Sequence, residues 1–511
     1  MAASRSARNA CFPCSAQKRA CDRQLPTCSR CAQHNVRCGY SQPMPLQDLS
    51  TELSVLNFNT TALPPLFTLS LLQLRSIRKK QNQTATGHHE LDAVLTSLFF
   101  NTLEGLGLGL QEVIDIYFQS THQWLPIIHP VTIRQKAAAL RNTPCAKVAC
   151  LLFHFLLVLP PCSSNFLSDI DVLSCLYHDC KTLFSLFQAH YRNELTTIQS
   201  GLLLALYEQS RGCYSDAYVT LTTCMSLGYI SRLNIPSVGP IIVEDEGMRV
   251  WWAIYFLGIL NNYSSKECDR LPIIREASVG EVLPGDDVSW SESSCPTYSA
   301  SPATLSFSRE QSPTNPGRFS HLIQAVFSLQ RVLQLTRKAF SLTDSSFEDE
   351  LWKLDSYLQQ EIHGALSISQ LNVQHSYSVL SMYLISIIEL HTTRLLRLSN
   401  QNNIENSTEL SIAALETALK VVGDLLHADG LGNILDVKQM PLTALLLLKN
   451  AGSTVLLLES QYERQTGDVL QTILEVLRAR ASGRWRAADD IRLELQKARD
   501  RDLHYRTTIP M

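Results

Sequence analysis

The sequence predicts a protein of two unlike parts, a small N-terminal module built on cysteine and a large all-α domain. Six of the 15 cysteines fall within residues 11–38 of the 511-residue chain. Residues 1–42 carry seven basic side chains and one acid, a charge of +6, so the remainder carries −9. Beyond residue 90, apolar residues recur with helical spacing, and strand-like alternation is scarce. The basic head suggests a polyanion partner for that part alone.

The cysteine content suits a reducing compartment better than a disulfide framework. The first residues, MAASRSARNACFPC, contain no apolar segment of the kind found in secretory signals. The longest apolar runs, near 148–160 and 250–260, are shorter than the ~18 residues that span a bilayer, so no membrane partner is expected. In a reducing compartment, clustered cysteines are more often metal ligands than disulfides.

The clustered cysteines form two arms of identical C-x2-C-x6-C spacing: Cys11, Cys14, Cys21, Cys28, Cys31 and Cys38. Zinc takes four thiolate or imidazole ligands, and a C-x2-C turn lets two sulfurs approach one ion. Six ligands cannot complete two separate tetrahedra, so two thiolates shared between two zinc ions would close the count. The symmetry of the arms assigns this bridging role to Cys11 and Cys28. Cys14 and Cys21 would then complete one ion, and Cys31 and Cys38 the other. So small a metal-nucleated module must draw its folding free energy largely from metal binding.

This segment resembles the binuclear zinc cluster of fungal transcription regulators, the family typified by the yeast galactose regulator. In that family each arm is a short helix followed by a strand, and a proline lies in the joining loop, where this chain has Pro26. An aromatic also follows the last cysteine by two residues, as Tyr40 does. The resemblance implies a module that binds two Zn²⁺ and double-stranded DNA. Its first helix would enter the major groove and read a CGG-type triplet.

Basic side chains in and before the cysteine segment are the candidate DNA contacts. Lys18 matches the family's main base-contacting position, and lysine or arginine donating to guanine O6 and N7 is the commonest specific contact. Phosphates would be contacted by Arg19, Arg23, Arg30 and Arg37, and by Arg5 and Arg8 on a flexible arm.

Three positions depart from the family's pattern. Ser15, Gln17 and Ala20 stand where the family usually has basic residues. With fewer cations, non-specific DNA affinity and its salt dependence should both be reduced. This departure keeps a second hypothesis open, in which the chain is a zinc-dependent co-regulator that binds proteins and does not read DNA directly.

Residues 43–90 are expected to form a linker. Leu46, Leu49, Leu53 and Leu56 give a partial heptad pattern, which Pro64-Pro65 ends. This pattern is compatible with a homodimer but is too short to establish one. A basic stretch follows, comprising Arg75, Arg78, Lys79 and Lys80. It could be a nuclear-import patch, a DNA-proximal element or a solvated helix end.

Residues 91–480 are predicted to form the all-α domain. The expected helices are 110–122, 145–159, 168–190, 194–210, 213–230, 245–260, 318–342, 375–398, 408–427, 440–462 and 467–480. Residues 116–129, 212–234 and 249–255, with Leu-Pro-Gly-Asp-Asp at 283–287, resemble the fungal-specific regulatory domain that accompanies the zinc cluster. The Ser/Pro-rich residues 289–317 are expected to be a flexible insertion, and residues 481–511 a charged C-terminal helix or tail, with an exposed helix from Arg478 to Arg506.

Several conspicuous residues of the body are best explained as core. Trp251, Trp252 and Tyr255 are spaced as one buried helix face, and Cys145, Cys150, Cys175 and Cys180 suit small buried hydrophobes. His122 and His129 have no third ligand in view.

No catalytic function is expected. The chain lacks a Walker A loop, G-x-G-x-x-G, G-x-S-x-G and H-E-x-x-H. The sequence therefore favours a zinc-dependent, sequence-specific DNA-binding transcription regulator in the nucleus. Its partners would be double-stranded DNA and co-regulator proteins.

Overall fold

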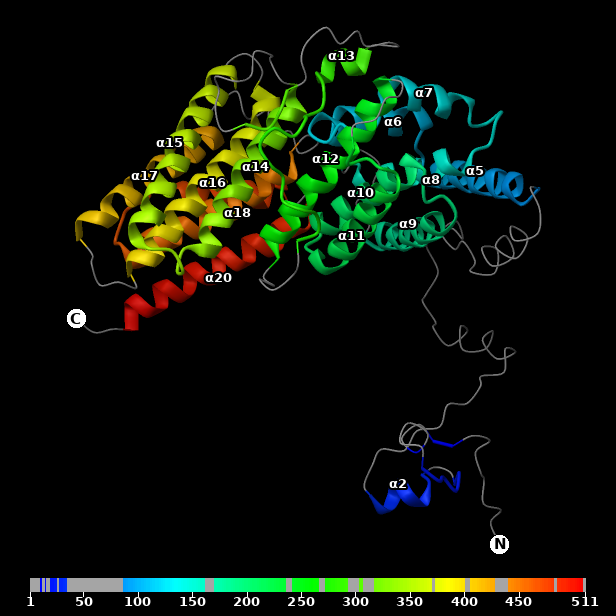
Figure 1. Cartoon of the computed structure of the whole chain (residues 1–511), viewed down its shortest axis with the longest axis horizontal. Coiled ribbons are helices and arrows are strands. Elements are labelled where there is room, and N and C mark those ends of the chain that lie inside the picture. Colours follow the sequence, from blue (N-terminus) through cyan, green and yellow to red (C-terminus); the bar gives the residue numbers. More distant parts are fainter. Residues whose placement is uncertain are drawn as a thin grey trace. The chain divides into compact units, whose positions relative to one another are not determined.

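The computed structural model divides the chain into two compact units, Met1–Pro64 and Pro65–Met511 (Figure 1). The structure describes residues 10–11, 14, 19–24, 27–34, 86–160, 170–235, 241–265, 272–292, 303–306, 317–369, 373–399, 405–427, 440–481 and 485–508. In the first unit the described regular element is helix α2, Ser29–Gln33, in the second cysteine arm. The second unit is helical, and its described residues contain no strand beyond one isolated bridge between Val282 and Thr304.

The helices of the second unit run in chain order through two groups. The first group comprises α5 (Thr86–Leu106), α6 (Leu110–Gln119), the 3₁₀ turn η1 (Thr121–Gln123), α7 (Pro130–Ala139), α8 (Ala146–Val158), α9 (Ile170–His190), α10 (Leu195–Ser210), α11 (Tyr214–Ile230) and α12 (Ile241–Ser264). The second comprises α13 (Asp287–Glu292), α14 (Arg318–Lys338), α15 (Asp344–Ser369), α16 (Val373–Ser399), α17 (Glu405–His427), α18 (Leu442–Gln461), α19 (Val469–Val476), the π-helical turn η3 (Leu477–Ala481) and α20 (Ala487–Thr508). The all-α prediction is confirmed, and each predicted helix is present.

Helix α10 is the centre of the first group. It contacts α8, α9, α11 and α12, and its side chains from Thr197 to Ser210 are buried. At Gly201 the neighbouring helices come so close that an added Cβ would lie 2.5 Å from both Cys224 Sγ and Phe184 Cε2. Glycine at this position therefore permits the approach of α9 and α11.

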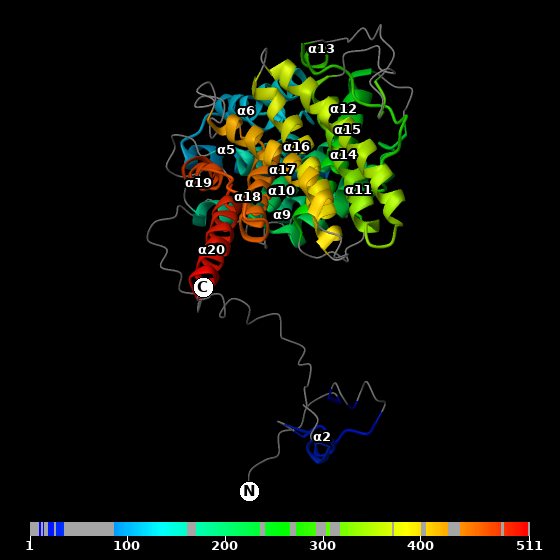
Figure 2. The same cartoon turned by 90° about the vertical axis from the view of Figure 1, so that its left-hand side faces the viewer.

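Helices α16 and α18 lie at the centre of the second group, as α10 does in the first (Figure 2). Helix α16 contacts α14, α15, α17 and α18. The residues Tyr377–Ser399 and Leu442–Gln461 are long and apolar enough to cross a membrane by length and composition alone, and so is the bent pair Glu90–Leu106 with Leu110–Gln123. The expectation that no apolar stretch is long enough was therefore wrong. In this fold 83% and 67% of the two single-helix windows are buried among other helices, which accounts for apolar residues on all sides.

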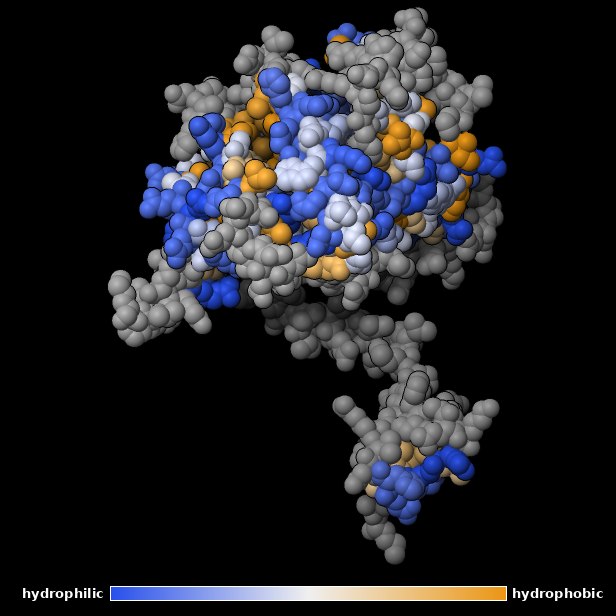
Figure 3. Space-filling model, turned by 60° about the vertical axis from the view of Figure 1, so that its left-hand side comes forward, coloured by the Kyte–Doolittle hydropathy of each residue, from blue (hydrophilic) through white to orange (hydrophobic). Residues whose placement is uncertain are grey.

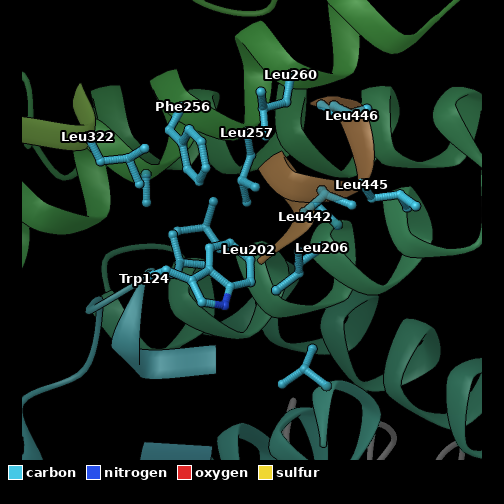
Figure 4. Close-up of a cluster of buried hydrophobic side chains, with 14 of the residues drawn as sticks. Trp124, Leu202, Leu206, Phe256, Leu257, Leu260, Leu322, Leu442, Leu445 and Leu446 are labelled. Carbon is cyan, nitrogen blue, oxygen red and sulfur yellow. The ribbon is translucent and has the colours of Figure 1, made fainter. Parts of the chain in front are cut away.

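A single apolar core joins the two groups. The ring of Trp124 lies edge-on to Phe256 in α12 and to Trp485 near the C-terminus, with centroids 6.3 Å and 6.5 Å apart. Figure 4 shows Trp124, which directly follows η1, and the surrounding side chains from α10, α12, α14 and α18: Leu202, Leu206, Phe256, Leu257, Leu260, Leu322, Leu442, Leu445 and Leu446. On the face drawn in Figure 3 the described residues are mainly hydrophilic, with apolar residues in small groups.

Two described positions within the insertion expected at 289–317 are packed in the structure, while residues 293–302 and 307–316 lie outside the described residues. Trp290, in α13, is fully buried beneath the guanidinium of Arg249, whose Cζ lies 4.1 Å from the ring centroid. Leu305 is also fully buried, and its backbone exchanges hydrogen bonds with Gly280 and Glu281. The Ser/Pro content alone gave no sign that Trp290 and Leu305 are buried.

The charged C-terminal segment also differs from the expectation of an exposed helix. Helix α20 packs on α18, and Ala488, Ile491 and Leu495 along one face belong to the apolar core. Leu495 fits over Gly452 of α18, where a Cβ would lie 2.6 Å from its Cδ1. The many charged residues on the other positions conceal this narrow apolar face in the sequence.

Four helices were missing from the sequence prediction: α5, α7, α13 and α15. Helix α15 had a readable signal, because the buried Phe347, Leu351, Leu354 and Leu358 recur with helical spacing among acidic residues. Helix α5 ends before Gly107, which adopts φ 64°, a conformation that suits glycine after a helix.

The two parts of the third segment that resembled a regulatory domain, 249–255 and 283–287, come together around Arg249. Its Nε donates to Asp245 at 2.7 Å, its guanidinium pairs with Asp287, and its Nη2 donates to the carbonyl of Gly285 at 2.8 Å. Asp245 in turn accepts from the backbone N–H of Gly285 at 2.9 Å. This buried network fixes the Pro-Gly-Asp-Asp loop against α12.

The conspicuous histidines and tryptophans of the body are structural, as expected. Trp251, Trp252 and Tyr255 are buried. The ring of His129 lies 3.0 Å from both Thr132 Oγ1 and the carbonyl of Trp290. Burial lowers the pKa of His122 to about 3, so this ring stays neutral in the core.

Candidate metal centre

The described part of the N-terminal unit has cysteine in place of an apolar core. Cys11, Cys14, Cys28 and Cys31 are at most 3% exposed, and Cys21 packs against them. No other described residue of this unit is buried. The sixth predicted ligand, Cys38, lies outside the described residues. The sequence segment thus folds with its thiols directed inward.

The sulfur atoms lie at the separations that zinc requires. Those of Cys11, Cys14, Cys21 and Cys28 are all within 4.8 Å of one another. Tetrahedral zinc with Zn–S bonds of 2.3 Å places its sulfurs about 3.8 Å apart. The Cys11–Cys28 and Cys11–Cys31 sulfur distances are 3.6 Å, and the Cys14–Cys28 distance is 3.8 Å. The residues present therefore fit a zinc–thiolate centre.

Cys11 and Cys28 each lie 3.6–3.8 Å from two sulfurs of the opposite arm. Cys11 Sγ lies 3.6 Å from Cys31, in the second arm, and Cys28 Sγ lies 3.8 Å from Cys14, in the first. The two also lie 3.6 Å from each other. A bridging thiolate has to reach the ligands of both ions, and these positions meet that requirement.

Helix α2 begins at the second arm and polarises one of these sulfurs. Cys28 is its N-cap residue, and Cys28 Sγ accepts a hydrogen bond from the backbone N–H of Cys31 at 3.4 Å. This bond lowers the pKa of Cys28 to about 6, whereas burial raises the pKa of Cys11. Zinc binds the thiolate form, so Cys28 is the more readily ionised ligand.

Asp22 is a structural residue that the sequence analysis counted only as a charge. Both of its carboxylate oxygens lie 3.1 Å from the backbone nitrogen of Ser29, which donates to them. A hydrogen bond from the Ser29 side chain, helped by this backbone bond, lowers the pKa of Asp22, and the backbone bond ties the end of the first arm to the start of α2.

The predicted DNA-contacting side chains are only partly described. Arg19 and Arg23 are exposed, and Arg30 lies half-buried on α2. The backbone N–H of Arg19 donates to the carbonyl of Cys14 at 2.9 Å, and Arg23 has a φ of 59°. Lys18, Arg37, Arg5 and Arg8 lie outside the described residues.

Comparison with known proteins finds similarity for both units. Residues 9–46 match the fungal Zn(2)-Cys(6) binuclear cluster domain, and residues 114–332 match the fungal specific transcription factor domain. The second match runs from α6 through most of α14. A curated relative, "Transcription factor BOA15" of Botryotinia fuckeliana (strain B05.10), is 30% identical over 118 residues. These residues are 23% of this chain, and the chain covers 64% of that relative's length.

Proposed function

The chain belongs to the fungal transcription factors that carry a Zn(2)-Cys(6) cluster and a fungal specific transcription factor domain. We propose that it regulates RNA polymerase II genes by binding specific DNA sites. Both families are families of transcription factors and not of enzymes. The observation that carries the proposal is the set of inward-facing sulfurs 3.6–3.8 Å apart, beside exposed arginines on the same short segment.

In this proposal the six cysteines hold two Zn²⁺, with Cys11 and Cys28 as the shared ligands. Zinc supplies the covalent framework that a segment without an apolar core otherwise lacks. The thiolates and ions together carry a charge of about −2, from six thiolates and two divalent ions, and the neighbouring arginines compensate it. The metal therefore acts in folding, and the chain's own cations make the DNA contacts.

Sequence reading is assigned to Lys18, and phosphate binding to the arginines. Lysine can donate to the O6 and N7 acceptors of guanine, and a module of this kind places a helix in the major groove. We propose a CGG-type triplet as the site read. Arg19, Arg23, Arg30, Arg37, Arg5 and Arg8 would contribute the salt-dependent part of the affinity.

The site of action in this proposal is the nucleus, and the targets are the genes of one metabolic or biosynthetic pathway. The helical unit would regulate the output of the DNA-bound head. Homodimers and co-regulator proteins are the proposed protein partners, because modules of this type read paired half-sites when they dimerise.

Binding-site selection with the zinc-loaded full-length chain tests the proposal. A randomised duplex library should yield CGG-type triplets, and the spacing between them reports whether the protein binds as a dimer. The variant Lys18→Ala should bind the selected duplex about 1–3 kcal/mol more weakly and discriminate less at the triplet. Lys420→Ala, an exposed lysine of α17, is the matched control and should bind like the wild type.

Two results would count against direct reading of DNA. One is equal affinity for CGG-containing and scrambled duplexes. The other is a specific footprint that forms only when a partner protein is added, which would favour the zinc-dependent co-regulator. The uncharged Ser15, Gln17 and Ala20 are the feature of this chain that makes the second result informative.

A further inference from the structure

A cavity of about 450 Å³ opens between four helices of the body. Its walls come from the C-terminal end of α12, the C-terminal half of α14, and the middle of α16 and α18. These helices lie together in Figure 1, and α16 contacts both α14 and α18. The volume lies within the ~300–1,000 Å³ typical of small-molecule sites. The cavity is far in sequence from the cysteine cluster, and no step of the proposed DNA binding uses it.

A chain of polar groups crosses the wall of the cavity. The side-chain amide of Asn450 donates to the hydroxyl of Tyr263 at 2.5 Å, and that hydroxyl donates to Glu389 Oε2 at 3.2 Å. The other carboxylate oxygen of Glu389 has no hydrogen-bond partner among the described residues, and it is not sealed from solvent. Burial raises the pKa of Glu389, so a cation placed beside it would favour the ionised form.

Two cations border the same cavity. Arg337, at the end of α14, is exposed, and Lys449, in α18, is partly exposed. Neither side chain forms an ion pair or hydrogen bond with another described residue. The cavity thus holds one carboxylate and two cationic side chains that have not paired with one another.

A second buried carboxylate in the body shows what a closed arrangement looks like. Glu208 Oε1 accepts from Lys181 Nζ at 2.8 Å and from the Tyr177 hydroxyl at 2.9 Å, and its Oε2 accepts from Thr220 at 2.8 Å. That carboxylate has a cation and two hydroxyls and needs no ligand. Glu389 has one hydroxyl partner, and the nearby cations stand apart from it.

We propose that this cavity binds a small zwitterion of the amino-acid class. The acid group of the ligand pairs with Arg337 and Lys449, and its ammonium group donates to Glu389. With Glu389 ionised, the charges of Arg337, Lys449 and Glu389 sum to +1. This net charge favours a ligand with a full anionic group, whose own cation lies inward beside Glu389. Because the walls come from α12, α14, α16 and α18, the occupied site would tie the two helical groups together.

Thermal unfolding of the full-length chain with each of the twenty proteinogenic amino acids tests the proposal. A ligand that binds only the folded state raises the unfolding midpoint, and about 10 mM of each compound suffices to detect weak binding. We expect at least one amino acid to raise the midpoint, and acetate and methylammonium at the same ionic strength to leave it unchanged. No shift with any amino acid, or an equal shift with acetate, would overturn the assignment.

Substitutions then locate the binding. Titration calorimetry with the active amino acid should show the Kd weakened at least tenfold in Glu389→Gln and in Lys449→Met, because each removes a charged hydrogen bond. Arg337→Met changes an exposed residue of the cavity, so the fold should tolerate it, and the Kd should again rise. Lys420→Met, also at an exposed position, is the control outside the cavity. An unchanged Kd in Arg337→Met and Lys449→Met would place the ligand elsewhere. DNA binding is not the readout, so this test fails or succeeds independently of the proposed function.

Discussion

In the N-terminal unit the buried side chains among the described residues are four cysteines, whereas one continuous apolar cluster runs through the helical unit from Leu91 to Leu495. The first arrangement concentrates stability in a few metal–sulfur bonds, and structural zinc contributes ~10–16 kcal/mol in small modules. The second distributes it over many side chains, each worth ~1.5–3 kcal/mol when buried. The two units should therefore respond to different perturbations, and the changes below are chosen to separate them.

The largest effect is expected from removing a bridging thiol. Cys28→Ser should abolish tight binding of both zinc ions, because Cys28 belongs to the second arm and yet lies 3.6 Å and 3.8 Å from two sulfurs of the first. Metal content per chain after dialysis gives the answer. Cys213→Ser removes an exposed cysteine of the body and should retain full zinc content. Retention of one tightly bound zinc by Cys28→Ser would rule out the bridging assignment.

The next effect concerns a place where the body also relies on a concentrated polar network. Arg249→Leu leaves Asp245 and Asp287 without their buried cation, and breaking such a pair costs about 3–5 kcal/mol. Denaturant unfolding of the body should show this loss while zinc content stays unchanged. The exposed pair Arg464–Glu409 is the contrast, and Arg464→Leu should cost less than about 1 kcal/mol. Equal costs for the two variants would contradict the buried network.

A smaller effect tests the close packing of α10. Gly201→Ala inserts a methyl group 2.5 Å from Cys224 Sγ and Phe184, and such overpacking costs about 1–3 kcal/mol. Gly423→Ala in α17 meets Val469 at 3.4 Å, an ordinary contact, and should be neutral or slightly stabilising. The difference between the two unfolding free energies is the measurement. A stabilising Gly201→Ala would show that α9 and α11 do not approach α10 so closely.

The smallest effect is pH-dependent and confined to the body. Burial raises the pKa of Asp179 in α9 to about 7, above its ordinary value near 3.8. The folded state therefore holds this proton more tightly, and Asp179 destabilises the body increasingly as pH rises from about 4 through 7. Asp179→Asn should stabilise the body by about 1 kcal/mol at pH ~8, since solvent screens this partly exposed group. The gain should vanish near pH ~4, and a gain independent of pH would contradict this cause.

Helix periodicity was enough to predict most of the body, and cysteine spacing was enough to predict the metal centre. Periodicity worked because helices such as α6 and α11 bury one face, at positions three or four residues apart. It failed where another pattern covered the signal. Charged residues concealed the apolar face of α20, and serine and proline concealed the anchors Trp290 and Leu305.

Other features could not be predicted because they arise from residues far apart in the chain. Arg249 meets Asp287 only through the folding of a loop onto α12. The cavity unites Tyr263, Glu389 and Asn450, which no local spacing connects. In the head, by contrast, all six predicted ligands lie within 28 residues, so their spacing alone carried the prediction. The hydrogen bond of Asp22 to Ser29 could not be predicted there, because a single acidic residue forms no repeated pattern.

Hydrogen exchange of the zinc-loaded full-length chain, before and after a strong chelator, tests most directly that metal holds one unit and apolar packing the other. The account predicts that amides of residues 28–34 lose their protection when zinc is removed, while those of α8, α10 and α16 keep theirs. Protection of residues 28–34 that survives chelation would contradict it, and so would simultaneous loss of protection in the helical core.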